Sequence, residues 1–144
     1  MSRASQITDA AAVLDRLPLA RFALAVTITL AGVHKLAAPE LWDAMVVGRW
    51  ADLLLPVSVR IWTLANGVAE VLVGLLLLLD RYTAPLAAFV LLSLLGTLCY
   101  IGLVTLIGAS LAIQTELLVV VGIHDIGLAG LAARVTLDAF RRDF

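Results

Sequence analysis

The sequence contains few charged residues, one cysteine and two histidines. Charged side chains make up 15% of the 144 residues, whereas they make up about a quarter of a soluble domain. The formal net charge of −1 gives no surplus of positive charge, so no nucleic-acid partner is expected. The single cysteine, Cys99, excludes an intramolecular disulfide and a cysteine-based metal site. Because Gly/Ser-rich linkers are also absent, the sequence predicts one domain over residues 1–144.

Apolar residues are abundant instead. They make up 62% of the chain, and the mean hydropathy is +1.07, a balance typical of integral membrane proteins. A transmembrane helix needs about 20 consecutive apolar residues. The sequence therefore predicts an all-α fold, an integral membrane four-helix bundle. The expected spans are residues 19–38, 59–79, 85–108 and 113–133.

Three further segments are predicted to lie on the membrane surface. Residues 1–18 carry two aspartates and lack an evident cleavage site, so we expect an amphipathic interfacial helix rather than a secretory signal, with a free tail as the alternative. Residues 39–56 are too charged to cross a bilayer, and their tryptophans favour headgroup depth. An interfacial helix capping one mouth of the bundle is expected there. The basic tail from Arg134 onward is also expected on the surface.

Lysine and arginine residues predict the orientation. Lys35, Arg49 and Arg60 fall on one side of the expected spans, and seven arginines fall on the other. Positive charge concentrates on the cytoplasmic side of membrane proteins. We therefore expect a multi-pass protein of the cell membrane with both termini in the cytoplasm. The seven are Arg3, Arg16, Arg21, Arg81, Arg134, Arg141 and Arg142.

Glu70 lies near the centre of the second expected span. A carboxylate at that depth costs on the order of 2.5–3.5 kcal/mol, so it is expected to face a protein interior or a wet cavity. Asn66 lies one turn before it on the same face. Counting about 1.5 Å per residue, several other polar side chains fall within about 8 Å of this depth. The predicted buried polar cluster contains Glu70, Asp125, His34, Asn66, Tyr100 and Thr97.

Asp125 and His124 are neighbours, so their side chains point about 100° apart. Asp125 shares a face with small residues and is predicted to face the interior, whereas His124 is expected at a helix junction or in contact with another subunit. Because His34 and His124 are predicted about 8 Å apart in depth, a bis-histidine haem is not expected. No metal ligands stand at i, i+3 or i+4 spacing, so no metal site is expected. No motif for conventional catalysis is present, so activity of the chain alone is not expected.

Three segments resemble the DoxX-like family of small membrane proteins: GVHKLAAPELW (32–42), NGVAEVLVGLLLLLDRYTAP (66–85) and HDIGLAGLA (124–132). The resemblance covers most of residues 19–133 and implies a four-helix membrane bundle. His124 stands where many relatives carry a basic residue, so a buried ion pair there would depend on pH. The family name is associated with terminal quinol oxidase and thiosulfate:quinone oxidoreductase activity. The matching positions are Gly32, Lys35, Glu70, Gly74, Asp125, Gly127 and Leu128.

Three functions follow as hypotheses. The first is an accessory or anchor subunit of a membrane redox complex, in which the buried polar cluster handles a proton or a quinone head group. Its partners would be the lipid bilayer and other membrane subunits. The second is a purely structural or assembly subunit whose polar residues hold helices together by hydrogen bonds. The third is a small proton-coupled carrier, which would have to dimerise because four helices are few for transport.

Overall fold

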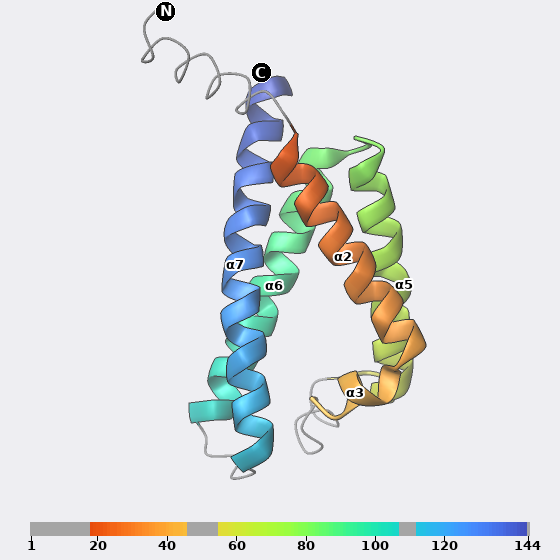
Figure 1. Cartoon of the computed structure of the whole chain (residues 1–144), viewed down its shortest axis with the longest axis vertical. Helices are drawn as coiled ribbons and strands as arrows, with labels where there is room; N and C mark the ends of the chain where they lie inside the picture. Colours follow the sequence, from red (N-terminus) through yellow and green to blue (C-terminus); the bar gives the residue numbers. More distant parts are fainter. Residues whose placement is uncertain (1–17, 46–54, 107–111, 144) are drawn as a thin grey trace, which may run out of the picture.

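The computed structural model describes residues 18–45, 55–106 and 112–143. Within these ranges the regular structure is helical: α2 (Leu19–Ala37), α3 (Pro39–Asp43), α5 (Val59–Leu78), α6 (Thr83–Leu106) and α7 (Ala112–Asp143). The four long helices are each long and apolar enough to cross a membrane. Together they form the predicted all-α membrane bundle (Figure 1).

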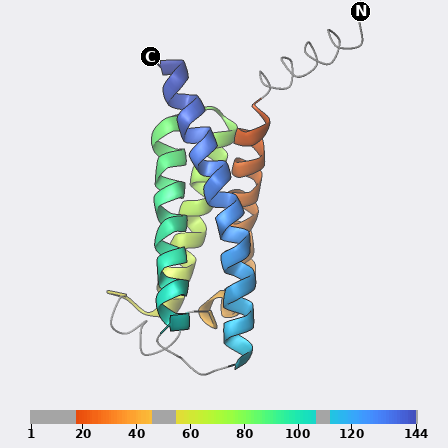
Figure 2. The same cartoon turned by 90° about the vertical axis from the view of Figure 1, so that its left-hand side faces the viewer.

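Short local signals set where the helices begin and reverse. Ser58 caps α5, and its Oγ accepts a hydrogen bond from the backbone N–H of Ile61 at 3.4 Å. The chain then turns sharply between α5 and α6, where Asp80 and Tyr82 adopt positive φ angles of 54° and 55°. Because successive long helices run in opposite directions, the start of α2, the α5–α6 turn and the end of α7 lie at one end of the bundle. α3 lies at the other end (Figures 1 and 2).

The helices pack as two pairs. α2 lies along α5, and α6 lies along α7, while contacts between the pairs are fewer. The ribbons of the two pairs diverge toward α3 (Figure 1). Glycines bring α2 and α5 together, because a Cβ on Gly32 would lie 2.6 Å from the carbonyl oxygen of Gly67. Small residues at such contacts are the usual way in which membrane helices associate.

A buried apolar cluster joins the two pairs near the start of α2. It includes Leu24 and Leu77, both fully buried, and residues of α6 and α7. The polar side chains of the spans therefore lie mostly in the other half of the molecule, toward α3. The cluster consists of Leu24, Ala25, Ile28, Val73, Leu77, Ala87, Val90, Ala132 and Val135.

The expected surface segments are described only in part. Residues 1–17, 46–54 and 107–111 lie outside the described residues. α3 accounts for the beginning of the segment between the first two spans. The tail from Arg134 is helical and continuous with the fourth span, because α7 runs unbroken to Asp143, about 48 Å from its start. The tail contains no Gly or Pro to end the helix, and Arg134 pairs with Asp138 one turn later at 2.7 Å.

Candidate functional site

Glu70 on α5 pairs with Lys35 in the last turn of α2. Lys35 Nζ donates a hydrogen bond to Glu70 Oε1 at 2.5 Å, and Lys35 is only 8% exposed. The glycine contacts between the two helices place the lysine within reach of the carboxylate. Each charge compensates the other, since a lone charge at this position would be costly. The pair was not expected, because Lys35 was used only as one of the charges that orient the spans and not as a partner for Glu70.

Glu70 also lines a small cavity of about 30 Å³ between α2, α5 and α6. Its second carboxylate oxygen, Oε2, is buried and accepts no hydrogen bond from the described residues. Asn66 and Ser93 are the other polar residues of the cavity, which is large enough for a water molecule. The structure thus places Glu70 and Asn66 in the lining of one cavity. The apolar lining consists of Ile28, Ala69, Val73, Phe89, Val90 and Leu94.

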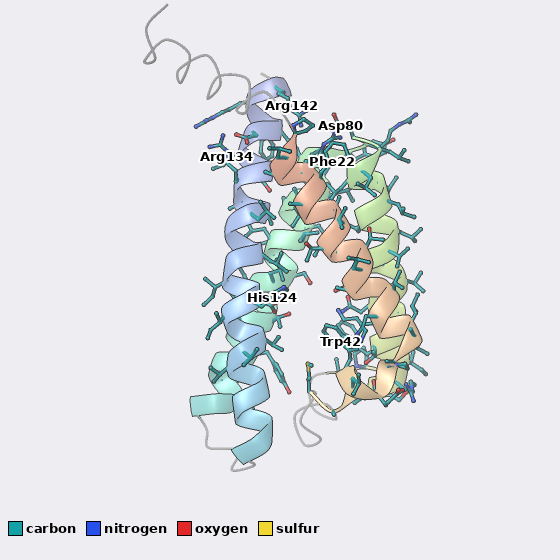
Figure 3. All side chains as sticks on the ribbon, in the orientation of Figure 1. Phe22, Trp42, Asp80, His124, Arg134 and Arg142 are labelled. Carbon is teal, nitrogen blue, oxygen red and sulfur yellow. The ribbon has the colours of Figure 1, made fainter. Side chains whose placement is uncertain are left out.

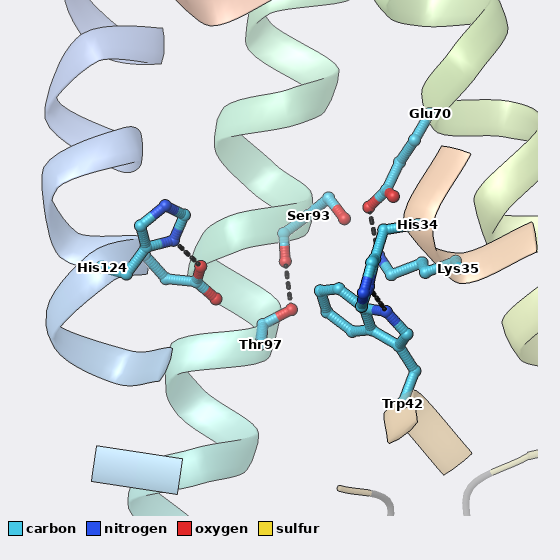
Figure 4. Close-up of polar contacts among 8 residues, drawn as sticks. His34, Lys35, Trp42, Glu70, Ser93, Thr97 and His124 are labelled. Carbon is cyan, nitrogen blue, oxygen red and sulfur yellow. Dashed lines mark hydrogen bonds and ion pairs between the residues drawn. The ribbon is translucent and has the colours of Figure 1, made fainter. Parts of the chain in front are cut away.

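Trp42 of α3 connects His34 and Lys35. Its indole N–H donates to His34 Nδ1 at 2.8 Å, and its ring lies 4.5 Å from Lys35 Nζ, within range of a cation–π interaction. His34 bonds to Trp42 and not to Glu70 (Figure 4). The structure therefore does not place His34 in the cluster around Glu70. His34 and Lys35 are consecutive on the helix, so only one of them can face α5.

Asp125 and His124 form the polar site of α7. Asp125 is 8% exposed, whereas the His124 side chain is 62% exposed. His124 Nδ1 lies 3.4 Å from Asp125 Oδ1 (Figure 4). The two side chains differ in burial as their spacing on the helix predicts. Asp125 is also close enough to Glu70 and Lys35 to interact electrostatically with both.

Thr97 and Tyr100 do not join the cluster around Glu70. The Thr97 hydroxyl donates to the carbonyl oxygen of Ser93 on its own helix at 3.2 Å, and Thr97 is exposed. Tyr100 packs beside the buried pair Ile101 and Val104. Hydroxyls in membrane helices commonly bond to their own backbone in this way. The single cluster expected from depth alone is therefore divided between the two helix pairs.

An open groove of about 600 Å³ lies between α2 and α7 on the side of α3. His34 and Trp42 line it from one side and His124 from the other, and Trp42 and His124 lie on opposite sides of the space between the pairs (Figure 3). The rest of the lining is small or apolar except for Thr27. Two imidazoles thus open onto one groove. The lining residues are Thr27, Leu30, Ala31, Val33, His34, Ala37, Trp42 and His124.

The two imidazoles offer opposite hydrogen-bonding groups. Because His34 Nδ1 accepts from Trp42, the proton of neutral His34 lies on Nε2, which is a donor. In His124, the Asp125 carboxylate favours a proton on Nδ1, and this leaves Nε2 as an acceptor. The groove therefore suits a ligand that carries both an acceptor and a donor. Among the described residues, no group of three or more His, Cys, Asp or Glu side chains could hold a metal ion.

Comparison with known proteins identifies one family. The model of the family described as DoxX matches residues 17–103, which is more than half of the chain. The matched region includes Lys35, Glu70 and the glycine contacts between α2 and α5, and it ends before α7 with His124 and Asp125. No curated protein and no solved structure matches the chain significantly.

Proposed function

This chain belongs to the DoxX family, and we propose that it is an accessory or anchor subunit of a membrane redox complex that works beside the quinone pool. In this proposal the chain is not a catalyst alone, and a partner oxidoreductase carries the electrons. The observation that carries the proposal is the groove between α2 and α7, onto which His34 and His124 open within the span of the bundle.

The head group of a quinone or quinol matches the polar groups of the groove. His34 Nε2–H can donate to a carbonyl oxygen, and His124 Nε2 can accept a hydrogen bond from a hydroxyl. Asp125 would stabilise the positive charge of His124 after it accepts a proton, as a carboxylate does beside a general base. The otherwise small and apolar lining suits the remainder of such a ligand.

The proposal includes an orientation in the cell membrane. Arg21, Arg81 and Arg142 lie toward the end of the bundle where α2 begins and α7 ends, and Arg60 lies at the end with α3. The greater positive charge favours the cytoplasm at the first of these ends. A reporter that is active only in the cytoplasm should be active when it is fused to the carboxyl terminus. An inactive fusion would indicate the opposite orientation.

The test is to purify the protein from its native membrane in a mild detergent and to extract it with organic solvent. We expect bound quinone and a co-purifying oxidoreductase. His34→Ala and His124→Ala should each lose the quinone, while Leu72→Ala, on an exposed residue that does not line the groove, should retain it. Absence of both the quinone and an oxidoreductase partner would overturn the proposal.

A purely structural subunit is the second candidate, and the Lys35–Glu70 pair favours it. This pair lies within one helix pair and is backed by the contact between Gly32 and Gly67, as expected for a link that holds α2 to α5. Under this function, Glu70→Gln would lower assembly and turnover of the parent complex together, because it breaks the ion pair with Lys35. Loss of proton-coupled turnover with assembly preserved would exclude it.

A further inference from the structure

A second charged cluster connects three distant parts of the chain at the end opposite α3. Arg21, in the first turn of α2, donates through Nη1 to the carbonyl oxygen of Leu77 at 3.3 Å. The same nitrogen lies 2.8 Å from Asp80 Oδ1 in the α5–α6 turn. Arg142, near the end of α7, lies 3.4 Å from Asp80 Oδ2. Asp80 and Arg142 meet there beside the start of α2 (Figure 3).

The two arginines do not share Asp80 equally. The Arg21 side chain is 11% exposed and holds the shorter contact, whereas the Arg142 side chain is 53% exposed. The Thr83 hydroxyl, which donates to Asp80 at 2.6 Å, and the two guanidinium groups hold the pKa of the Asp80 carboxyl below its ordinary value. Asp80 is therefore a single negative charge at neutral pH, and Arg21 largely neutralises it. The charge of Arg142 is left in surplus.

Neighbouring arginines add to this surplus. Arg81 and Arg141 are exposed and adjoin Asp80 and Arg142 in the sequence. Arg134, two turns earlier on α7, differs because it pairs with Asp138 at 2.7 Å. Among the described side chains, positive charge is thus unmatched around Arg142 and matched around Arg134.

The position of the cluster selects the kind of anion. Arg21 and Asp80 lie at the ends of two adjacent spans, where the hydrocarbon core of a bilayer gives way to lipid phosphates. Exposed apolar side chains flank them: Leu79 and Tyr82 are 71% and 72% exposed, and the Arg21 guanidinium lies 5.2 Å from the centre of the Phe22 ring. A lipid can satisfy the surplus charge and cover this apolar surface together, which a free anion cannot do.

We propose that the surplus charge at Arg142 binds the phosphodiester of an anionic phospholipid, with its acyl chains along Leu79 and Tyr82. Arg142 supplies guanidinium donors that Asp80 does not occupy, and guanidinium groups recognise phosphate through paired hydrogen bonds. Arg81 adds a second charge next to the site. An anionic lipid is preferred to a zwitterionic one because the latter brings its own positive charge.

Native mass spectrometry of the purified full chain, titrated with phosphatidylglycerol or phosphatidylcholine, tests the proposal. We expect tighter binding of phosphatidylglycerol and a loss of about five-fold in Arg142→Gln, since one arginine near the surface contributes about 1 kcal/mol. Arg134→Gln removes the same net charge from the same helix and is the matched control. It should bind like the wild type, because Asp138 already matches the charge of Arg134. Circular dichroism of both variants checks that the helices remain folded.

Three results would overturn the proposal. Equally weakened binding of phosphatidylglycerol in Arg142→Gln and Arg134→Gln would mean that the lipid is attracted by the overall positive charge and not by a site at Arg142. Displacement of phosphatidylglycerol by inorganic phosphate would mean a site for a free anion. Preference for an acidic peptide over the lipid would mean a docking surface for protein.

Discussion

Replacing Gly32 by Ala should separate α2 from α5 and destabilise the fold. The added Cβ would lie 2.6 Å from the carbonyl oxygen of Gly67 and 2.8 Å from the backbone nitrogen of Val71. Both atoms belong to the backbone of α5, so they cannot move aside as a flexible side chain can. Restoring ordinary contact at 3.4 Å requires the helices to move apart locally by about 0.8 Å.

The cost can be estimated from this overlap. Overpacking by one methyl group in a well-packed interior typically costs about 1–3 kcal/mol. Here the displacement also affects the Lys35–Glu70 contact, which lies one turn further along α2 and has a short Nζ–Oε1 distance. We therefore expect a loss toward the upper part of that range, about 2–3 kcal/mol.

The assay is unfolding of the purified protein in mixed detergent, monitored through tryptophan fluorescence and circular dichroism. Gly96→Ala is the matched control, because a Cβ on Gly96, another glycine within a membrane helix, meets no atom within 4 Å. Gly96→Ala should be as stable as the wild type or more stable, since alanine favours the helix. Equal stability of Gly32→Ala and Gly96→Ala would contradict a close contact between α2 and α5 at Gly32.

Three further predictions concern the charged and polar contacts. Lys35→Met should lower the free energy of unfolding by roughly 3–5 kcal/mol by leaving Glu70 unpaired, and the double variant Lys35→Met/Glu70→Leu should recover most of it in a double-mutant cycle. Because the pKa of Asp80 is lowered in the folded state, the Asp80 carboxylate stabilises the fold above about pH 4. This contribution to the free energy of unfolding is lost as the pH falls further. Between about pH 6 and about pH 3, the free energy of unfolding should therefore fall more for the wild type than for Asp80→Asn. Trp42→Phe keeps an aromatic ring near Lys35 but removes the donor to His34, so quinone affinity should fall about five-fold, measured by equilibrium binding.

Much of the fold could be predicted because its signals are local. Hydropathy and length locate the four membrane helices. The full length of α7 was missed because the fourth span was expected to end before the charged residues that begin at Arg134. In the structure, Ala132, Val135 and Ala139 remain buried along α7, and this packing extends the helix to Asp143. In the sequence, these small apolar residues continue at helical spacing past Arg134, and this pattern could have predicted the longer helix.

The site could be predicted only in part, because depth does not determine direction. Glu70 and Asn66 share a face and line the same cavity. His34 has nearly the right depth, but it faces α3, and Lys35 next to it takes the position at Glu70. Lys35 is near the end of the first expected span and was counted with the charges of one membrane surface, but a long side chain can reach back along a helix. The lysine one turn after Gly32 could have indicated the pair, since glycine marks the face that approaches α5.

Photolabelling in native membranes with an azido-quinone, followed by peptide mapping, tests the proposed function most directly. The groove predicts labels on residues 27–37 of α2 and beside His124 of α7, and an excess of unmodified quinone should prevent them. His124→Ala should lose the label and Leu72→Ala should keep it. Labels confined to the lipid-exposed surface, or labels that unmodified quinone does not displace, would contradict a quinone site in this groove.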